Sequence, residues 1–166
     1  MGDKGTVLLL NYLFANHPRQ LHQLLPIFSS VNDCKSHLID VLSSQNKRHA
    51  ERLTLKSRLK SFNLDQQLTL LEAHGISALY RDDDDYPALL NEISDPPPVL
   101  FTKGSRSALS QPLMAIVGPR KPSPYGRHIA EILSRDLLLR YGICSGLARG
   151  IDTIVHHSNG DQTMTT

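Results

Sequence analysis

Two short segments of the chain combine glycine, proline and cationic residues in a way that suits phosphate binding. They are Gly118-Pro-Arg-Lys-Pro-Ser-Pro-Tyr-Gly126 and Ser145-Gly-Leu-Ala-Arg-Gly-Ile-Asp152. Glycine lets a backbone approach a ligand closely, and Arg120, Lys121 and Arg149 supply positive charge. An arginine can also hold a phosphate through two parallel hydrogen bonds. The chemistry predicted for both segments is therefore the binding of anions.

Other residues of the two segments fit the same chemistry. Gly118 permits a sharp turn, and Ser123 places a hydroxyl at the start of a helix, where free N–H groups and the helix dipole attract anions. Gly146 and Gly150 permit close backbone approach in the second segment. Tyr125 has two interpretations: it stacks on a base, or it packs against the edge of a sheet.

The elements around these segments form a βαβα pattern. The apolar run 113–117 predicts a strand buried on both faces, and 143–145 predicts a second strand. Ser123 is a good N-cap with proline after it, so a helix begins there, and another begins at 151–157. The stripe expected to be buried on the first helix consists of Ile129, Ile132, Leu133 and Leu137.

The order of these elements determines where the two segments lie. Both follow parallel strands, and such strands end at the same edge of a sheet, so we expect the two segments to converge on one anion site. The tail 158–166 is polar and predicts no third strand. The sheet is therefore expected to be incomplete at its C-terminal side.

The first half of the chain predicts a helical domain. Helical periodicity runs through residues 6–75, Asn63 is a good N-cap, and Gly75 supplies a left-handed stop. A short strand is expected over 76–80. The apolar positions expected on the helical faces are Leu8, Leu9, Tyr12, Leu13, Leu21, Leu24, Leu25, Leu64, Leu68 and Leu71.

An acidic and proline-rich connector separates the two patterns. It contains Arg81-Asp-Asp-Asp-Asp-Tyr86, then Asp95-Pro-Pro-Pro98, and then the lead-in strand Val99-Leu-Phe-Thr102. The predicted organisation is a helical domain over 1–80, a connector over 81–112, and the first part of an α/β domain over 113–166.

Charge is distributed unevenly along the 166 residues, whose formal net charge is only +2. Lys and Arg outnumber Asp and Glu by nine to six over 1–80 and by eight to four over 101–166, but are outnumbered by one to six over 81–100. A basic ridge recurs every fourth residue at Arg48, Arg52, Lys56 and Lys60. It is either a solvated helix face or a surface for a phosphate backbone.

Composition excludes several classes of protein. Cys34 and Cys144 have no metal-ligand spacing and indicate reduced thiols, with Cys144 expected in the core. No stretch approaches the roughly 18 apolar residues that a membrane span needs, and the first six residues are too polar for a signal peptide. We therefore expect a cytoplasmic protein with no metal and no cofactor.

Three segments in order resemble the DprA (Smf) family of DNA-processing proteins. Residues 145–156 are similar to its S-G-L-A-R-G-I-D-x-x-x-H signature, residues 118–126 to its G-x-R-x-P-S-x-Y-G loop, and residues 85–101 to its connector. The resemblance implies a Rossmann-like parallel sheet, incomplete here at the C-terminus, preceded by a small helical SAM-like domain. It also implies a non-enzymatic protein of natural transformation that binds single-stranded DNA, protects it and loads RecA onto it.

The resemblance also implies which residues contact DNA. Together with the residue chemistry above, it gives the candidate set Gly118, Arg120, Lys121, Ser123, Tyr125, Ser145, Gly146, Arg149 and Gly150. In the family, the part of the domain beyond His156 carries the surfaces for dimerisation and for RecA, whereas this chain turns polar there. A homodimer is therefore expected of the full-length protein, and a truncated remnant without full activity is an alternative.

Two further functions compete with DNA binding. A nucleotide-binding Rossmann enzyme would need G-x-G-x-x-G and an acidic residue after the second strand, and neither is present. Asp152 and His156 share one helix face, an arrangement that more often orients structure than performs catalysis. A helical interaction module with an inert α/β segment is the other alternative.

Overall fold

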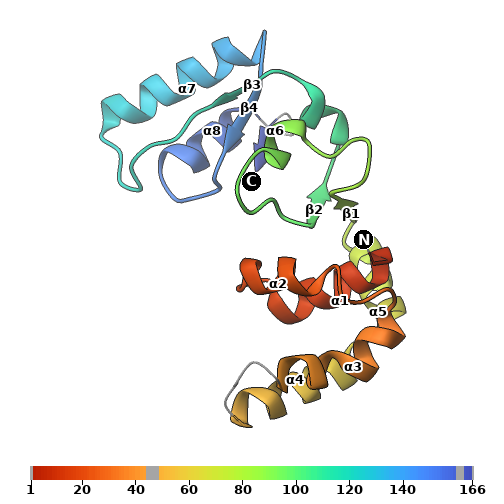
Figure 1. Cartoon of the computed structure of the whole chain (residues 1–166). Coiled ribbons are helices and arrows are strands. Elements are labelled where there is room, and N and C mark those ends of the chain that lie inside the picture. Colours follow the sequence, from red (N-terminus) through yellow and green to blue (C-terminus); the bar gives the residue numbers. More distant parts are fainter. Residues whose placement is uncertain (1, 44–48, 160–162, 166) are drawn as a thin grey trace. The chain divides into compact units, whose positions relative to one another are not determined.

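The computed structural model describes residues 2–43, 49–159 and 163–165. The chain divides into two compact units, Met1–Lys103 and Gly104–Thr166. Both are drawn in Figure 1. The first unit contains α1 (Lys4–Phe14), α2 (Pro18–Leu24), α3 (Val31–Ser43), α4 (His49–Ser61), α5 (Leu64–Ala73), β1 (Ile76–Tyr80), α6 (Ala88–Asn91) and β2 (Val99–Lys103). The second contains the 3-10 helix η1 (Arg106–Ser110), β3 (Leu113–Ala115), α7 (Pro124–Leu138), β4 (Gly142–Ser145), α8 (Ile151–Asn159) and β5 (Thr163–Thr165).

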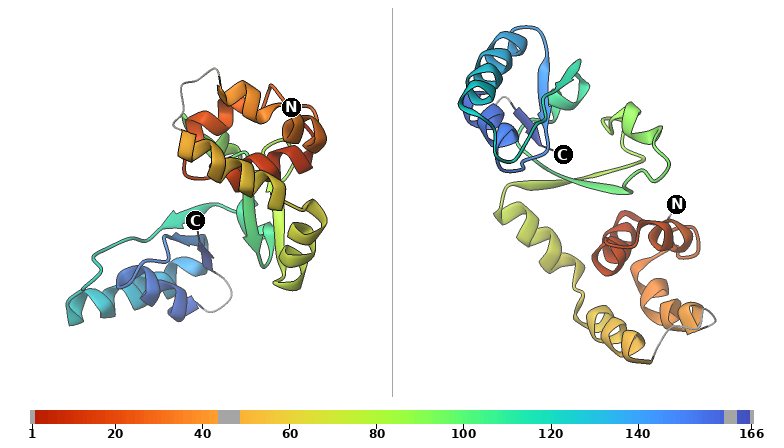
Figure 2. Two further views of the ribbon diagram at one scale, coloured as in Figure 1. Left: turned by 90° about the horizontal axis from the view of Figure 1, so that it is seen from below. Right: turned by 90° about the vertical axis from the view of Figure 1, so that its left-hand side faces the viewer.

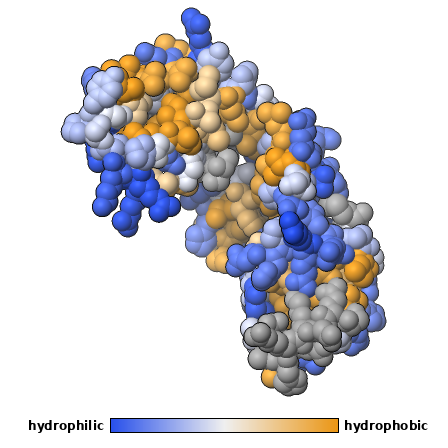
Figure 3. All heavy atoms as spheres, turned by 60° about the vertical axis from the view of Figure 1, so that its left-hand side comes forward, coloured by the Kyte–Doolittle hydropathy of each residue, from blue (hydrophilic) through white to orange (hydrophobic). Residues whose placement is uncertain are grey.

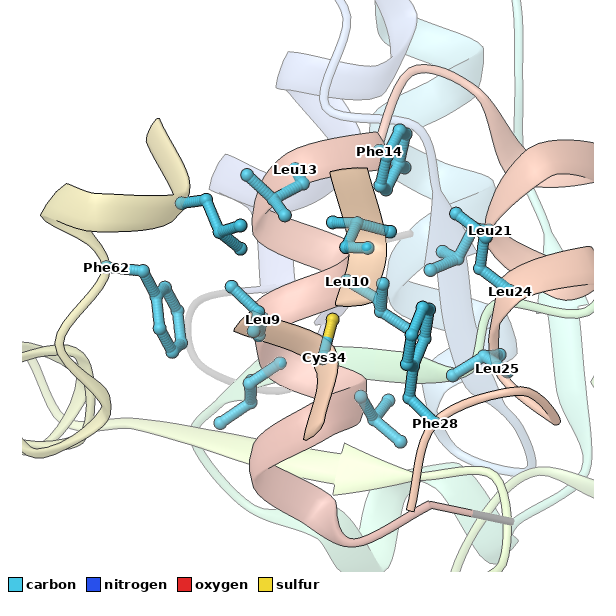
Figure 4. Close-up of a cluster of buried hydrophobic side chains, with 14 of the residues drawn as sticks. Leu9, Leu10, Leu13, Phe14, Leu21, Leu24, Leu25, Phe28, Cys34 and Phe62 are labelled. Carbon is cyan, nitrogen blue, oxygen red and sulfur yellow. The ribbon is translucent and has the colours of Figure 1, made fainter. Parts of the chain in front are cut away.

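The core of the first unit is built around α1. Leu9 and Leu10 are fully buried, and leucine and phenylalanine side chains from the neighbouring helices surround them (Figure 4). Cys34 lies in the same cluster, and its burial, followed by the charge of Asp33, raises the pKa of its thiol to about 12. The helices predicted from periodicity in this part of the chain are present.

Two cationic side chains of this unit serve its structure. Arg58 donates hydrogen bonds to the carbonyls of Tyr12 and Leu13, the latter at 3.2 Å, and its guanidinium lies over the Tyr12 ring. Lys35 Nζ donates to the Phe62 carbonyl at 2.8 Å. These bonds satisfy carbonyls at or just beyond the C-terminal ends of α1 and α4, which have no partner within their helices.

Asp33, in the first turn of α3, accepts hydrogen bonds that stabilise its charged form. Its Oδ2 accepts from the Ser29 amide at 3.1 Å, and its Oδ1 lies 3.0 Å from His37 Nδ1. The bond from Ser29 and then the bond with His37 lower the pKa of this carboxyl below its usual 3.8.

The residues predicted to begin and end α5 are confirmed. The Asn63 side chain accepts from the Gln66 amide at 3.1 Å, and Gly75 adopts a left-handed φ of 64°. The chain then enters β1, which pairs antiparallel with β2 from Ile76↔Lys103 to Tyr80↔Val99. No residue of α5 is fully buried; its leucine stripe lines a hollow of about 520 Å³ beside α1 and β1 instead.

The second unit holds a three-stranded parallel sheet in the order β3-β4-β5, with β4 in the centre. Helices α7 and α8 pack on each other and share one apolar cluster with β4, so they cover the same face of the sheet. Figure 2 gives two further views of this arrangement. The predicted α/β fold with a helical portion is confirmed.

Three expectations for this unit are wrong in detail. A third strand exists, because β5 pairs with β4 from Ile143↔Thr163 to Ser145↔Thr165. The strand predicted over 113–117 ends at Ala115 and is exposed, because the helices cover only one face and β3 pairs with β4 alone among the described residues. Cys144 is only partly buried.

The buried stripe of α7 also differs from the prediction. Its fully buried residues are Ala130 and Ser134, whereas Ile132 and Leu133 remain exposed. Small residues one turn apart let α8 and β4 approach α7 closely, and periodicity of large apolar residues does not reveal such a contact. Apolar side chains accordingly reach the surface of this unit, in the upper part of Figure 3.

No helix among the described residues combines the length and the apolar composition that a membrane span requires.

Candidate nucleic-acid interface

The two predicted segments meet at the carboxyl ends of β3 and β4. The first loop is residues 116–123 and the second is residues 146–150. The hydroxyl of Ser145, the last residue of β4, donates to the Ile116 carbonyl at 2.7 Å and ties the two strand ends together. Further along, the Ile151 amide donates to the Pro119 carbonyl at 3.4 Å. The expected convergence of the loops is therefore present in the structure.

Glycine is required where the loops touch. Gly150 has φ 93°, and a Cβ on it would lie against the Pro119 carbonyl and 2.7 Å from Arg120 Cα. A Cβ on Gly118 would lie 2.6 Å from Cγ1 of Ile151, at the start of α8. A larger residue at position 150 would push the two backbones apart, and one at position 118 would displace the Ile151 side chain, so both glycines allow the close approach.

Asp152 organises the second loop. This side chain is only 5% exposed, and its Oδ2 accepts hydrogen bonds from the Gly146 amide at 3.2 Å and from the Ala148 amide at 3.3 Å. The Thr153 hydroxyl donates to the Ala148 carbonyl at 2.8 Å. The loop is thus anchored on the first turn of α8, and Leu147 between the two amides takes a φ of 55°.

The first loop ends in a capped helix, as predicted. The Ser123 side chain accepts from the Gly126 amide at 3.1 Å, and Pro124 occupies the first helical position. Ser123 is exposed to solvent. Tyr125 is 74% exposed and is therefore not packed against the sheet edge, one of its two interpretations.

The cations of the two loops all face solvent. Arg120, Lys121 and Arg149 are exposed, and so is Arg127 in the first turn of α7, which sequence reasoning missed. Its position one helical turn after the Ser123 cap was the sequence signal that could have identified Arg127 as a further cation near the first loop. Within the part of the chain that the structure describes, none of the four forms an ion pair. Their charge is left to attract an anion.

The candidate residues separate into those that hold the loops in place and those whose side chains are exposed. Gly118, Ser145, Gly146 and Gly150 hold the loops in place through the contacts above. The exposed side chains are those of Arg120, Lys121, Ser123, Tyr125 and Arg149, and the Ser123 oxygen also caps α7. Direct contact between DNA and any of the nine remains a prediction.

The basic ridge can be followed only in part. Arg48 lies outside the described residues, and only the backbone of Arg52 is described. Lys56 and Lys60 are exposed on α4. For a metal ion, the residues over 2–43, 49–159 and 163–165 offer no group of three or more His, Cys, Asp or Glu side chains.

Comparison with known proteins identifies the family. The sequence model of the DNA recombination-mediator protein A family matches residues 77–166, which include both loops. The chain belongs to this family. It is 33% identical over 120 residues to the DNA processing protein DprA of Bacillus subtilis (strain 168), a match that covers 70% of this chain and 40% of that protein.

Two further comparisons with DprA match a shorter and a longer part of this chain. The DprA of Streptococcus pneumoniae (strain R6) is 42% identical over 85 residues, which are 49% of this chain and 30% of that one. The X-ray structure of DprA from Streptococcus pneumoniae superposes with a TM-score of 0.65 and 27% identity, over 95% of this chain and 54% of that one. The chain thus spans about half, or less, of the length of these relatives.

Proposed function

We propose that this chain binds single-stranded DNA through the exposed face of the two loops, in a protein that processes DNA during natural transformation. The observation that carries the proposal is the contact of Gly150 with Pro119 and Arg120. It brings two loops that carry unpaired cations to one sheet edge, where parallel α/β sheets bind their ligands. Membership of the DNA recombination-mediator family supports DNA as the anion.

We propose that the chain makes and breaks no covalent bond. Two buried side chains near the loops that might serve as a nucleophile or a base, those of Ser145 and Asp152, already have structural partners. The Ser145 hydroxyl donates to the carbonyl of Ile116, the residue after β3, and the buried Asp152 carboxylate accepts from two amides. The function that fits such a site is binding, with affinity from phosphate contacts and little dependence on sequence.

The test compares arginine variants on single strands. Arg120→Ala and Arg149→Ala each remove one phosphate contact, so the slope of log affinity against log salt should become shallower by about 0.7 for each. Fluorescence anisotropy with labelled oligonucleotides at several salt concentrations measures this slope. Affinity should fall by a similar factor on oligonucleotides of different sequence.

Arg140→Ala is the matched control, because Arg140 is also exposed in the second unit but lies after the far end of α7. It should bind single strands with the affinity and salt slope of the parent. If Arg120→Ala and Arg149→Ala also match the parent, the loops are not the binding surface. Lys56 and Lys60 would then be the next residues to change.

We further propose that the bound strand is protected and passed to RecA, and that the full-length protein acts as a homodimer in the cytoplasm. The family description as a recombination mediator supports the transfer to a recombinase. The measurement is the rate at which RecA covers a single strand in the presence and in the absence of the chain. A rate that the chain leaves unchanged would contradict the transfer.

A further inference from the structure

Leu147 stands out among the residues of the second loop. It is the only non-glycine residue with a positive φ, 55°, over the ranges 2–43, 49–159 and 163–165. Leucine adopts this left-handed conformation at a cost that glycine or asparagine largely avoids. The side chain is also 61% exposed, so burial in the unit's own core does not compensate for the cost.

The contacts of the loop explain how the conformation is held. The amides of Gly146 and Ala148, on either side of Leu147, both donate to Oδ2 of Asp152. Because that carboxylate is buried at the start of α8, the backbone at position 147 is fixed from both sides. The loop therefore presents an apolar side chain to solvent in a defined position.

The surroundings indicate what this side chain meets. Arg149 lies two residues further along the loop, and Gly150 brings the loop against Arg120. Tyr125, at the start of α7, is exposed as well. An apolar side chain on a loop that also carries an unpaired cation complements a ligand that offers apolar faces between phosphates, and an unstacked polynucleotide has this chemistry.

We propose that Leu147 contacts the face of a nucleobase in a single strand whose phosphates are bound by Arg120 and Arg149. In a duplex the base faces are covered by their neighbours, so this contact is available only where bases are unstacked. Leu147 then contributes to the preference for single strands, which the phosphate contacts alone do not provide. The inference rests on the proposed DNA binding and assigns its base-contacting residue.

The experiment uses Leu147→Asn and two labelled strands of equal length and charge, an oligothymidylate and one built from abasic tetrahydrofuran units. Asparagine accepts a positive φ, so the loop keeps its backbone while the apolar surface is removed. By fluorescence anisotropy, the affinity for oligothymidylate should fall about fivefold, the lower end of what a base stacked on an aromatic side chain contributes, because an aliphatic side chain covers less of the base. The affinity for the abasic strand should stay that of the parent.

Leu139→Asn is the matched control, since Leu139 is 85% exposed just beyond the far end of α7, and it should bind both strands as the parent does. Leu147→Gly, which also permits the left-handed backbone, should repeat the result of Leu147→Asn. Equal binding of parent and variant to oligothymidylate, or an equal loss on both strands, overturns the base contact but leaves DNA binding intact. Failure of the parent to bind either strand overturns both proposals.

Discussion

A methyl group added at position 150 would act on the contact that joins the two loops. In Gly150→Ala the new Cβ lies against the Pro119 carbonyl, 2.7 Å from Arg120 Cα and 2.8 Å from its carbonyl carbon. Alanine at a φ of 93° costs about 1–3 kcal/mol in backbone strain. Forcing a methyl group into a filled space costs about 1–3 kcal/mol more. The free energy of unfolding should therefore fall by roughly 2–6 kcal/mol.

Gly104→Ala separates these two contributions. Gly104 has a similar φ of 99°, but a Cβ there would have no neighbour within 4 Å, so this variant carries only the backbone strain. Urea unfolding followed by circular dichroism gives both losses, and hydrogen exchange of α7 and α8 peptides shows whether the second unit is the part affected. Equal losses in the two variants would refute the close approach of the loops.

Three further predictions concern the first unit and its neighbour. Cys34 should react with a thiol reagent at pH 8 only after unfolding, because its thiol is buried and has a pKa of about 12. The partly exposed Cys144 should react in the native protein, and equal native rates for the two thiols would contradict this prediction. Arg58→Ala should lower the free energy of unfolding by about 1–3 kcal/mol through lost hydrogen bonds to α1, and Lys56→Ala by much less, as measured in urea. Because the pKa of Asp33 is lowered in the folded state, its charged form stabilises the fold above about pH 3.8. That contribution is lost as the pH falls through the folded-state pKa of Asp33. In Asp33→Asn, the free energy of unfolding should therefore fall less steeply as the pH is lowered through this acid range.

Local signals predicted the parts of the fold that depend on neighbours in sequence. The Asn63 and Ser123 caps use a side chain to accept an amide three residues further on, and the residue types alone indicate that bond. Gly75 takes the left-handed φ expected of a helix stop. The convergence of the two loops followed from strand order, because both loops leave the same edge of a parallel sheet.

Contacts between distant elements were not visible in the sequence. The strand Thr163–Thr165 is short and polar, and it is a strand because its backbone pairs with β4, not because of a hydrophobic pattern. On α7, the small residues Ala130 and Ser134 are buried where the helix meets its neighbours, although the larger Ile132 and Leu133 gave the stronger signal. Both errors come from inferring burial from residue type alone.

The functions of individual loop residues depend on where their hydrogen bonds go. Ser145 and Gly146 were candidates for DNA contact by type and position, yet the hydroxyl of one and the amide of the other are used within the unit. Arg120 and Arg149 were also candidates by type and position, and their side chains are exposed. Changes at the first pair should therefore lower stability and DNA binding together, while changes at the second pair should lower binding alone. Measuring unfolding and binding on the same variants separates residues that shape the interface from residues that touch the strand.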